Sequence, residues 1–317
     1  MAEPGPIAAA PRVRGRVTSG AAAPAPRGSQ TQTQHLLLTL LGDYWYEREE
    51  YLPSAALVDL LAEFTVTAFS ARAALNRLTR RSLLRCEKRG RRTYYALAPR
   101  AAAVLTEGGR RIVCFGAHPR PWDGRWAFIA FSVPESQRPL RHALRERLRW
   151  LGYAPLYDAL WVAPHDQAGK IRAALDELNL HSATIFTGTL HPESPGAGDP
   201  LSAWDLESLR TRYEEFLVTW RPWADRTRAG TVTLVEALRA RTEVMDVWRT
   251  FPGLDPELPA ELLPATWPQA EARRLFIEIY DGLGPLAEMR VRQLLTPHDP
   301  ALAALATHHR TAQLVEG

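Results

Sequence analysis

A helical pattern of apolar residues that starts at Thr67 is the clearest local signal in the chain. Apolar side chains recur there at i, i+3, i+4 and i+7, at Ala71, Ala74, Leu75 and Leu78. This spacing is typical of a helix that buries one face, and Thr67 stands where an N-cap hydroxyl is expected. From Leu83 to Leu97, two β-prone runs surround a turn that contains Gly90, which predicts a hairpin.

The outward side of this helix and the tip of the hairpin are strongly cationic. Between Ser70 and Arg92 there are nine Lys or Arg residues and a single acid, Glu87. In winged helix-turn-helix proteins a helix reads base edges in the major groove, while the following hairpin contacts phosphate. The sequence predicts this arrangement. A solvated amphipathic helix with an incidental run of charge is the alternative interpretation.

The side chains of this surface divide into two groups by their chemistry. We expect Phe69, Ala73 and Asn76 to contact bases, because Asn can pair with adenine while Ala and Phe can contact thymine methyl groups. The cations are expected to hold phosphate, and these are Arg72, Arg77, Arg80, Lys88, Arg89, Arg91 and Arg92. The expected partner is therefore double-stranded DNA.

The N-terminal third is predicted to be an arm followed by a winged-helix domain. Residues 1–32 are rich in Ala, Pro, Gly and Arg without apolar periodicity, which predicts a disordered arm. An apolar run at 36–46 and a helix at 55–64, capped by Ser54, complete a winged-helix domain over residues 33–98. A linker helix is expected within residues 99–121.

The middle of the chain alternates strand and helix patterns. Strand-like and helix-like runs follow one another at 126–133, 138–150, 154–163, 168–178 and 182–188. If the third run is a hairpin, the order is β-α-β-β-α-β, which predicts a ferredoxin-like domain over residues 122–190. We expect this domain to supply dimer contacts and spacing. A linker rich in Pro, Gly and Ser follows.

From residue 200 to about 300 the periodicity is helical, and residues 301–317 are expected to be a tail. The fold class is therefore α+β. Tryptophans and arginines gather in the helical domain, and such rings can line a ligand pocket or simply fill the core. We expect any such pocket to lie between the middle and C-terminal domains and to be formed by Arg221, Arg241, Trp223 and Trp248.

Composition fits a soluble protein of two or three domains. The 317 residues are 46% apolar and 23% charged, and no apolar run approaches the ~18 residues of a membrane span. The formal charge of +4 favours a polyanionic partner only through its clustering near the hairpin. Two cysteines, Cys86 and Cys114, are too few for a disulfide framework, so we expect a reducing cytoplasm.

Several longer motifs resemble a known family. The chain is similar to the phenylacetic acid degradation repressor (PaaX) family of bacterial transcription regulators over residues 34–295. The motifs that carry the resemblance are Leu40-Leu41-Gly42-Asp43-Tyr44, the helix segment 70–78, Gly90-Arg91-Arg92-Thr93-Tyr94-Tyr95, Trp122-Asp123-Gly124-Arg125-Trp126, 131–134, 149–152, 161–164, 255–259 and 262–268.

The resemblance implies a fold and a function. It implies a winged helix, a middle domain similar to a CRISPR-associated ferredoxin-like endonuclease, and a helical C-terminal domain. It also implies a dimeric repressor that leaves its operator when an aryl-acyl-CoA, typically phenylacetyl-CoA, binds. Phe64-Thr65 stands where such proteins often have a Gly turn, and Ser82-Leu83 replaces the usual Gly-Trp before the wing. We therefore expect these two turns to differ in geometry.

Catalytic signatures are absent from the sequence. The similar endonucleases have a metal-binding aspartate where this chain has Ser132, and Asp123 and Glu135 lie outside the predicted strand. One such pair holds Mg²⁺ poorly. No Gly-x-x-x-x-Gly-Lys loop, Gly-x-Ser-x-Gly elbow or helical His pair is present. We expect no enzyme activity, metal or cofactor.

Together these features predict a homodimeric, ligand-responsive transcriptional repressor of an aromatic-acid (phenylacetate-type) catabolic operon. Its expected partners are an operator duplex, an acyl-CoA effector and a second copy, with no membrane. The alternatives are a metal-dependent nuclease, a helical scaffold that binds protein or RNA, and a repressor that answers to an unrelated effector.

Overall fold

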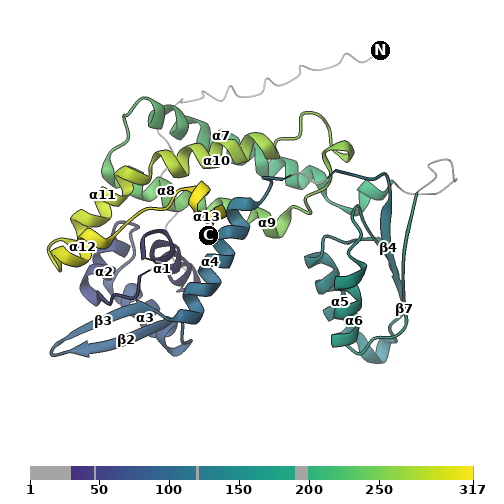
Figure 1. Ribbon diagram of the computed structural model, residues 1–317, viewed down its shortest axis with the longest axis horizontal. Coiled ribbons are helices and arrows are strands. Elements are labelled where there is room, and N and C mark those ends of the chain that lie inside the picture. Colours follow the sequence, from purple (N-terminus) through teal and green to yellow (C-terminus); the bar gives the residue numbers. More distant parts are fainter. Residues whose placement is uncertain (1–29, 46–47, 119–120, 190–198, 317) are drawn as a thin grey trace, which may run out of the picture.

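The structure is a computed structural model that describes residues 30–45, 48–118, 121–189 and 199–316. A winged-helix unit lies beneath a layer of C-terminal helices, and a small sheet domain stands to one side (Figure 1). This confirms the predicted α+β class. The arm expected at 1–32 lies outside the described residues, except that Gln30, Thr31 and Gln32 begin the first helix.

The N-terminal unit has the predicted order of helices and hairpin. Its elements are α1 (Gln30–Trp45), β1 (Leu52–Pro53), α2 (Ser54–Ala62), α3 (Ala68–Arg80), β2 (Leu84–Arg89) and β3 (Arg92–Leu97). The three strands pair in the order β1-β3-β2. Thr67 caps α3 as predicted, since its hydroxyl accepts from the Ser70 amide at 3.2 Å. Ser54 is not a cap, because it is already the first residue of α2 and Pro53 precedes it.

Two turns adopt a left-handed backbone without glycine. Thr65, between α2 and α3, has a φ of 60°, and Ser82, before β2, has a φ of 56°. Both turns therefore take the backbone conformation that glycine favours, although neither residue is glycine. The cost is steric, since Cβ crowds the backbone there, and it is highest for a β-branched residue.

Thr65→Gly is expected to stabilise the protein by about 0.5–1 kcal/mol, since relief of the left-handed strain exceeds the entropy that glycine adds to the unfolded chain. Urea denaturation would measure the change. Thr65→Ala is the matched control, because it keeps Cβ and loses the same hydroxyl. A glycine variant no more stable than the alanine variant would contradict the prediction.

The linker helix α4 (Pro99–Cys114) leads to a four-stranded domain. Its elements are β4 (Trp126–Phe131), a 3-10 turn η1 (Glu135–Gln137), α5 (Arg138–Trp150), β5 (Ala154–Tyr157), β6 (Leu160–Ala163), α6 (Ala168–Glu177) and β7 (Ala183–Gly188). The strand order β5-β6-β4-β7 puts the first strand beside the last and the third. This confirms the predicted ferredoxin-like arrangement.

The central strands of the middle sheet, β4 and β6, are buried on both faces. One face packs against α5 and α6 around Ile129, Leu144 and Trp161. On the other face Trp126 and Phe128 pack against segments from the C-terminal part of the chain, including Trp204 and Leu262. The continuous apolar run of β4 is thus explained by burial on both sides.

The C-terminal part is helical as predicted. Its elements are η2 (Pro200–Ala203), α7 (Leu206–Arg228), α8 (Leu234–Trp248), α9 (Phe251–Leu254), η3 (Ala260–Leu262), α10 (Gln269–Gly282), α11 (Gly284–Leu295), α12 (Pro300–Leu305) and α13 (Thr311–Glu316). Residues 301–317 are not a free tail, because through Glu316 they form α12, α13 and a connecting strap. Ala303, Ala306 and Thr311 are buried.

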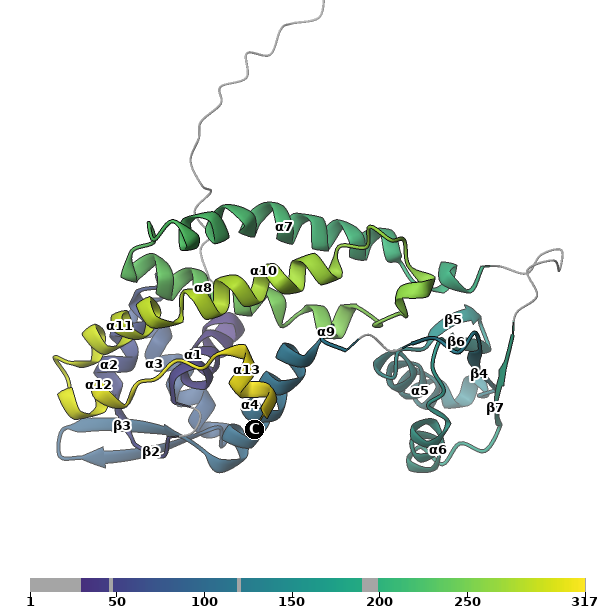
Figure 2. The ribbon, with the colours of Figure 1, turned by 45° about the horizontal axis from the view of Figure 1, so that its top comes forward.

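The winged-helix unit and the C-terminal helices share one hydrophobic core. Leu37 and Leu40 of α1 belong to the same buried cluster as Trp248 of α8 and Phe276 of α10. Ion pairs join the two parts as well, such as Arg290 of α11 with Glu63 at 2.7 Å. Figure 2 shows α8, α10 and α11 lying directly over α1 and α2. The two parts therefore form a single packed body.

A buried aspartate anchors the loop between α9 and α10. The Tyr213 hydroxyl and the Gln269 amide donate to Asp255 Oδ2 at 2.6 and 3.1 Å, and the Glu257 amide donates to Oδ1 at 2.7 Å. The same loop contacts the linker, because Gly116 donates its amide to Glu257 at 3.2 Å. Burial raises the pKa of Asp255 to about 6, although the bonds from Tyr213 and the Glu257 amide oppose the shift.

This raised pKa gives the stability a defined pH dependence. The folded state holds the Asp255 proton more tightly than the unfolded chain, whose pKa is about 3.9, so the contribution is complete below that value and is lost as pH rises through about 6. The loss is at most about 3 kcal/mol. Asp255→Asn should remove it, which urea denaturation from pH 4 to 7 would show. A pH-independent difference between the two proteins would contradict this.

Candidate nucleic-acid interface

One face of α3 is open to solvent along its length. Phe69 is 82% exposed, and Arg72, Asn76 and Arg80 are also exposed. Ala73 and Arg77 are half-buried, and the apolar side of the helix is packed in the core. The structure thus brings the three expected base-contacting residues to one surface with the three expected phosphate ligands of this helix.

The composition of this face is unusual for one that meets only water. An aromatic ring as exposed as that of Phe69 keeps its apolar area in water, which marks contact surfaces when polar groups surround it. Within the described part of the chain, Arg72, Arg77 and Arg80 form no ion pair or side-chain hydrogen bond. The face therefore has uncompensated positive charge beside the apolar ring of Phe69 and the side-chain amide of Asn76.

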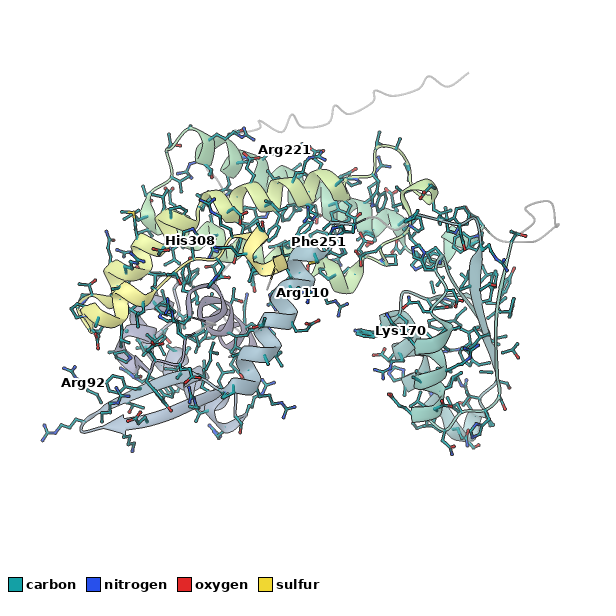
Figure 3. The ribbon with its side chains drawn as sticks, viewed as in Figure 1. Arg92, Arg110, Lys170, Arg221, Phe251 and His308 are labelled. Atoms are coloured by element: carbon teal, nitrogen blue, oxygen red, sulfur yellow. The ribbon has the colours of Figure 1, made fainter. Side chains whose placement is uncertain are left out.

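Strand alternation divides the cations of the wing, which we define as residues 84–97. Cys86 and Lys88 share the face of Leu84, which packs toward the core, whereas Glu87 and Arg89 lie on the opposite face. Gly90 occupies the turn with a φ of 61°. The exposed cations at the tip are Lys88, Arg89, Arg91 and Arg92. Arg92 lies near the left end of the molecule in Figure 3, far from Lys170 of the middle domain on the right.

Arg89 differs from its neighbours because its guanidinium is already engaged. Its Nε and Nη2 donate to the two carboxylate oxygens of Glu87 at 3.0 Å each. This fork lowers the pKa of Glu87 and raises that of Arg89, chiefly through the hydrogen bonds. Lys88, Arg91 and Arg92 have no such partner among the described residues. Three of the four residues of the wing that are expected to bind phosphate are thus free to do so.

Sequence reasoning missed the aromatic residues on the outer face of the wing. The Arg89 guanidinium lies over Tyr94 at 4.8 Å and over Tyr51 at 5.6 Å, and Arg85 lies over Tyr51 at 5.3 Å. Strand alternation could have placed Tyr94 beside Glu87 and Arg89. Tyr51 gave no such signal, because it precedes the two-residue strand β1, which only its pairing with β3 defines.

Three profiles of one protein family match this chain in order. The profile described as PaaX-like protein matches residues 32–101, that of the PaaX protein central Cas2-like domain matches 119–199, and that of the PaaX-like protein C-terminal domain matches 204–293. The chain belongs to the PaaX-like family. The match to a central Cas2-like domain agrees with the ferredoxin-like strand order.

Two individual proteins show how far this likeness extends. The transcriptional repressor PaaX of Escherichia coli (strain K12) is 26% identical over 258 residues, which cover 80% of this chain and 80% of that protein. A solved structure of the uncharacterized protein Rv0674 from Mycobacterium tuberculosis has a TM-score of 0.54 and 21% identity. It covers 84% of this chain and 99% of its own, and at this identity it shows the fold alone.

In this PaaX-like protein two of the four residues expected to bind an effector lie in the core, and the other two are engaged with neighbouring side chains. Trp248 is fully buried and stacks on Phe276 with ring centroids 5.0 Å apart, so it is a core residue. Trp223 packs beneath Arg226, and Arg221 is paired with Glu271 at 2.7 Å. The expected placement is corrected for Trp248 and Arg241, because full burial leaves them no open surface.

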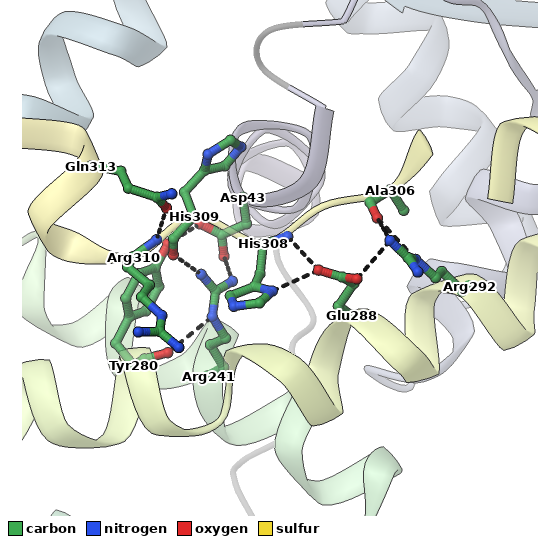
Figure 4. Close-up of polar contacts among 10 residues, drawn as sticks. All are labelled: Asp43, Arg241, Tyr280, Glu288, Arg292, Ala306, His308, His309, Arg310 and Gln313. Atoms are coloured by element: carbon green, nitrogen blue, oxygen red, sulfur yellow. Dashed lines mark hydrogen bonds and ion pairs between the residues drawn. The ribbon is translucent and has the colours of Figure 1, made fainter. Parts of the chain in front are cut away.

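Arg241 of α8 is the centre of a buried polar network that joins three parts of the chain (Figure 4). Its Nε donates to the Tyr280 carbonyl at 3.1 Å and its Nη2 donates to the His309 carbonyl at 2.8 Å. Its Nη1 lies 3.4 Å from Asp43 Oδ2 of α1, and the Tyr280 hydroxyl donates to Oδ1 at 2.7 Å. Burial raises the pKa of Asp43, and the charge of Arg241 opposes this. The network fixes α1 to the C-terminal helices.

The strap before α13 completes this network. The His308 amide and Nδ1 lie 3.0 and 2.6 Å from Glu288 Oε2, and Arg292 donates two hydrogen bonds to the Ala306 carbonyl at 3.1 and 3.0 Å (Figure 4). The Thr307 amide lies 3.4 Å from the Tyr44 carbonyl of α1. The last described residues thus bridge the two halves of the shared core.

The middle domain has a hollow on its surface. It has a volume of about 470 Å³ and lies between α5 and α6, lined by residues such as Ala143, Arg147, Trp150 and Leu178.

At the end of β4, Ser132 stands where the similar endonucleases have an aspartate. The carboxylates of the two nearby acids are already engaged, because Asp123 accepts from the Arg125 amide and Glu135 is paired with Arg141. Among the described helices, none is long and apolar enough to cross a lipid bilayer.

Proposed function

We propose that this chain is a ligand-responsive, DNA-binding transcriptional repressor. The observation that carries the proposal is the open face of α3, where the exposed Phe69 and Asn76 lie among unpaired arginines. Such a face matches the edges and phosphates of a major groove. Membership of the PaaX-like family and the name of the E. coli relative support it.

The proposed docking uses two copies. Two recognition helices related by a two-fold axis read half-sites of a pseudo-palindrome on one DNA face. In each copy Phe69, Ala73 and Asn76 meet bases. Phosphate is held by Arg72, Arg77, Arg80, Lys88, Arg91 and Arg92.

The proposed effector is an aryl-acyl-CoA such as phenylacetyl-CoA, and the regulated genes are those of aromatic-acid catabolism. An effector shifts the DNA-binding state only as far as it prefers one conformation. The shared core supports such coupling, because α8 and α11 pack directly on α1 and α2, so a rearrangement of the C-terminal helices displaces the winged helix.

Fluorescence anisotropy on labelled duplex from the protein's own upstream region tests the proposal. We expect the anisotropy of the duplex to rise when the protein binds and to fall again when phenylacetyl-CoA is added, while free CoA serves as the control and a denaturing gel shows that the duplex stays intact. Release by neither compound, with binding intact, would indicate an unrelated effector. Cleavage in the presence of Mg²⁺ would favour the nuclease, and equal competition by single-stranded RNA would favour a scaffold.

A further inference from the structure

The wing contains one acid among its cations, and the structure shows what it contacts. Glu87 faces Tyr94 across the hairpin, on the outer side of the sheet. Both of its carboxylate oxygens accept from the Arg89 guanidinium. A two-pronged hydrogen bond of this kind fixes the plane of the guanidinium as well as its position. The Nε–Nη2 edge of the guanidinium, one of the edges that could bind a phosphate, is therefore occupied from within the wing.

Two tyrosines hold the same guanidinium. Arg89 lies over the rings of Tyr94 in β3 and Tyr51 next to β1. Arg85 approaches Tyr51 as well, and its Nη2 donates to the Glu49 carbonyl at 3.4 Å. The cluster formed by Tyr51, Arg85, Glu87, Arg89 and Tyr94, called here the wing clamp, thus includes residues from or beside all three strands.

The location of the clamp matters because the wing tip lacks other support. Among the described residues β1 pairs with Tyr94 and Tyr95 alone, so residues 88–93 extend past the third strand as a two-stranded ribbon. Isolated two-stranded hairpins are marginally stable in water. The clamp lies where the ribbon leaves the three-stranded sheet, next to the segment that holds Lys88 and Arg91.

We propose that Arg89 and Glu87 are positioning residues that orient the wing for DNA, and that Arg89 is not itself a phosphate ligand. This inference rests on the proposed DNA-binding function. Glu87 then increases operator affinity despite its negative charge, because it holds Arg89 in place. If Glu87 only repelled phosphate, its neutralisation would have the opposite effect.

Glu87→Gln tests the proposal by the direction in which operator affinity changes. We expect operator affinity to fall by about three- to tenfold at every salt concentration, with an unchanged slope of log K against log salt. Tighter binding, or a slope that rises by about one per protomer because Arg89 is released to phosphate, would overturn the proposal. Anisotropy titrations between 50 and 200 mM salt measure both the affinity and the salt slope, because the affinity of a protein for DNA changes by about a thousandfold or more over this range.

Two Arg→Lys variants, which conserve the charge, distinguish a residue that positions the wing from one that contacts phosphate directly. Arg89→Lys keeps the charge but loses the planar fork, so we expect it to bind as weakly as Arg89→Ala. Arg91→Lys is the matched control and should stay close to wild type, because a phosphate contact needs only the charge. Wild-type affinity for Arg89→Lys, together with a lowered salt slope for Arg89→Ala, would overturn the proposal.

A measurement without DNA keeps this inference separate from the proposed function. Amide hydrogen exchange of residues 87–93 should become faster in Glu87→Gln and in Arg89→Lys, but not in Arg91→Lys, because only the first two break the clamp. Unchanged exchange in both would overturn the proposal. If the wild type binds no operator while exchange responds as expected, the DNA-binding function fails and the clamp stands.

Discussion

Arg241→Met is expected to lower the free energy of unfolding by about 3–5 kcal/mol, because it leaves the buried Asp43 carboxylate without its cation. Two further acceptors lose their donor, the carbonyls of Tyr280 and His309. Since these groups lie on α1, α10 and the strap, the loss should loosen the winged helix from the C-terminal helices. Urea denaturation measures the stability, and hydrogen exchange of α1 and α8 locates the change.

Two controls make this result specific. Arg221→Met removes an exposed arginine paired with Glu271 and should cost no more than about 1 kcal/mol. The double variant Asp43→Leu, Arg241→Met should recover part of the loss, because it removes the unpaired buried carboxylate, while the Tyr280 hydroxyl and the two carbonyls stay without their partners. Equal costs for Arg241→Met and Arg221→Met would show that the buried network does not hold the two halves together.

Asn76→Ala should weaken operator binding by about tenfold to a hundredfold and relax the preference at one base pair, because an amide-to-adenine contact contributes roughly 1–3 kcal/mol of discrimination. Its side chain is exposed on α3, so the folded protein should be unaffected. Anisotropy titrations against the operator and a set of single-base variants would measure both effects.

Arg91→Ala provides the contrast within the same interface. Arg91 lies at the wing turn without an ion-pair partner in the described chain, so its loss should weaken all duplexes alike. The salt slope should fall by about one per protomer. If neither Asn76→Ala nor Arg91→Ala alters operator binding, the docking of α3 and the wing on DNA is incorrect.

Local chemistry in the sequence was enough to locate most elements. The apolar spacing from Ala71 to Leu78, the Thr67 cap and the turn at Gly90 each act over a few residues, so helix α3 and the hairpin of β2 and β3 could be predicted and are confirmed. The order of strands and helices along the middle domain followed from the alternation of patterns in the same way, and the sheet order β5-β6-β4-β7 agrees with the ferredoxin-like domain predicted from it.

The sequence alone determined which residues form the cationic, amide-bearing face of α3, because helical periodicity fixes which side chains share a face. Only the tertiary structure decided the roles of Arg241, Trp248 and the residues after 300. Their partners lie far away in sequence, as Arg241 shows with Asp43 and His309. Whether an arginine is exposed and free to bind a ligand, or buried and paired in the core, depends on such distant contacts. These contacts produce no periodic pattern in the sequence from which burial could be predicted.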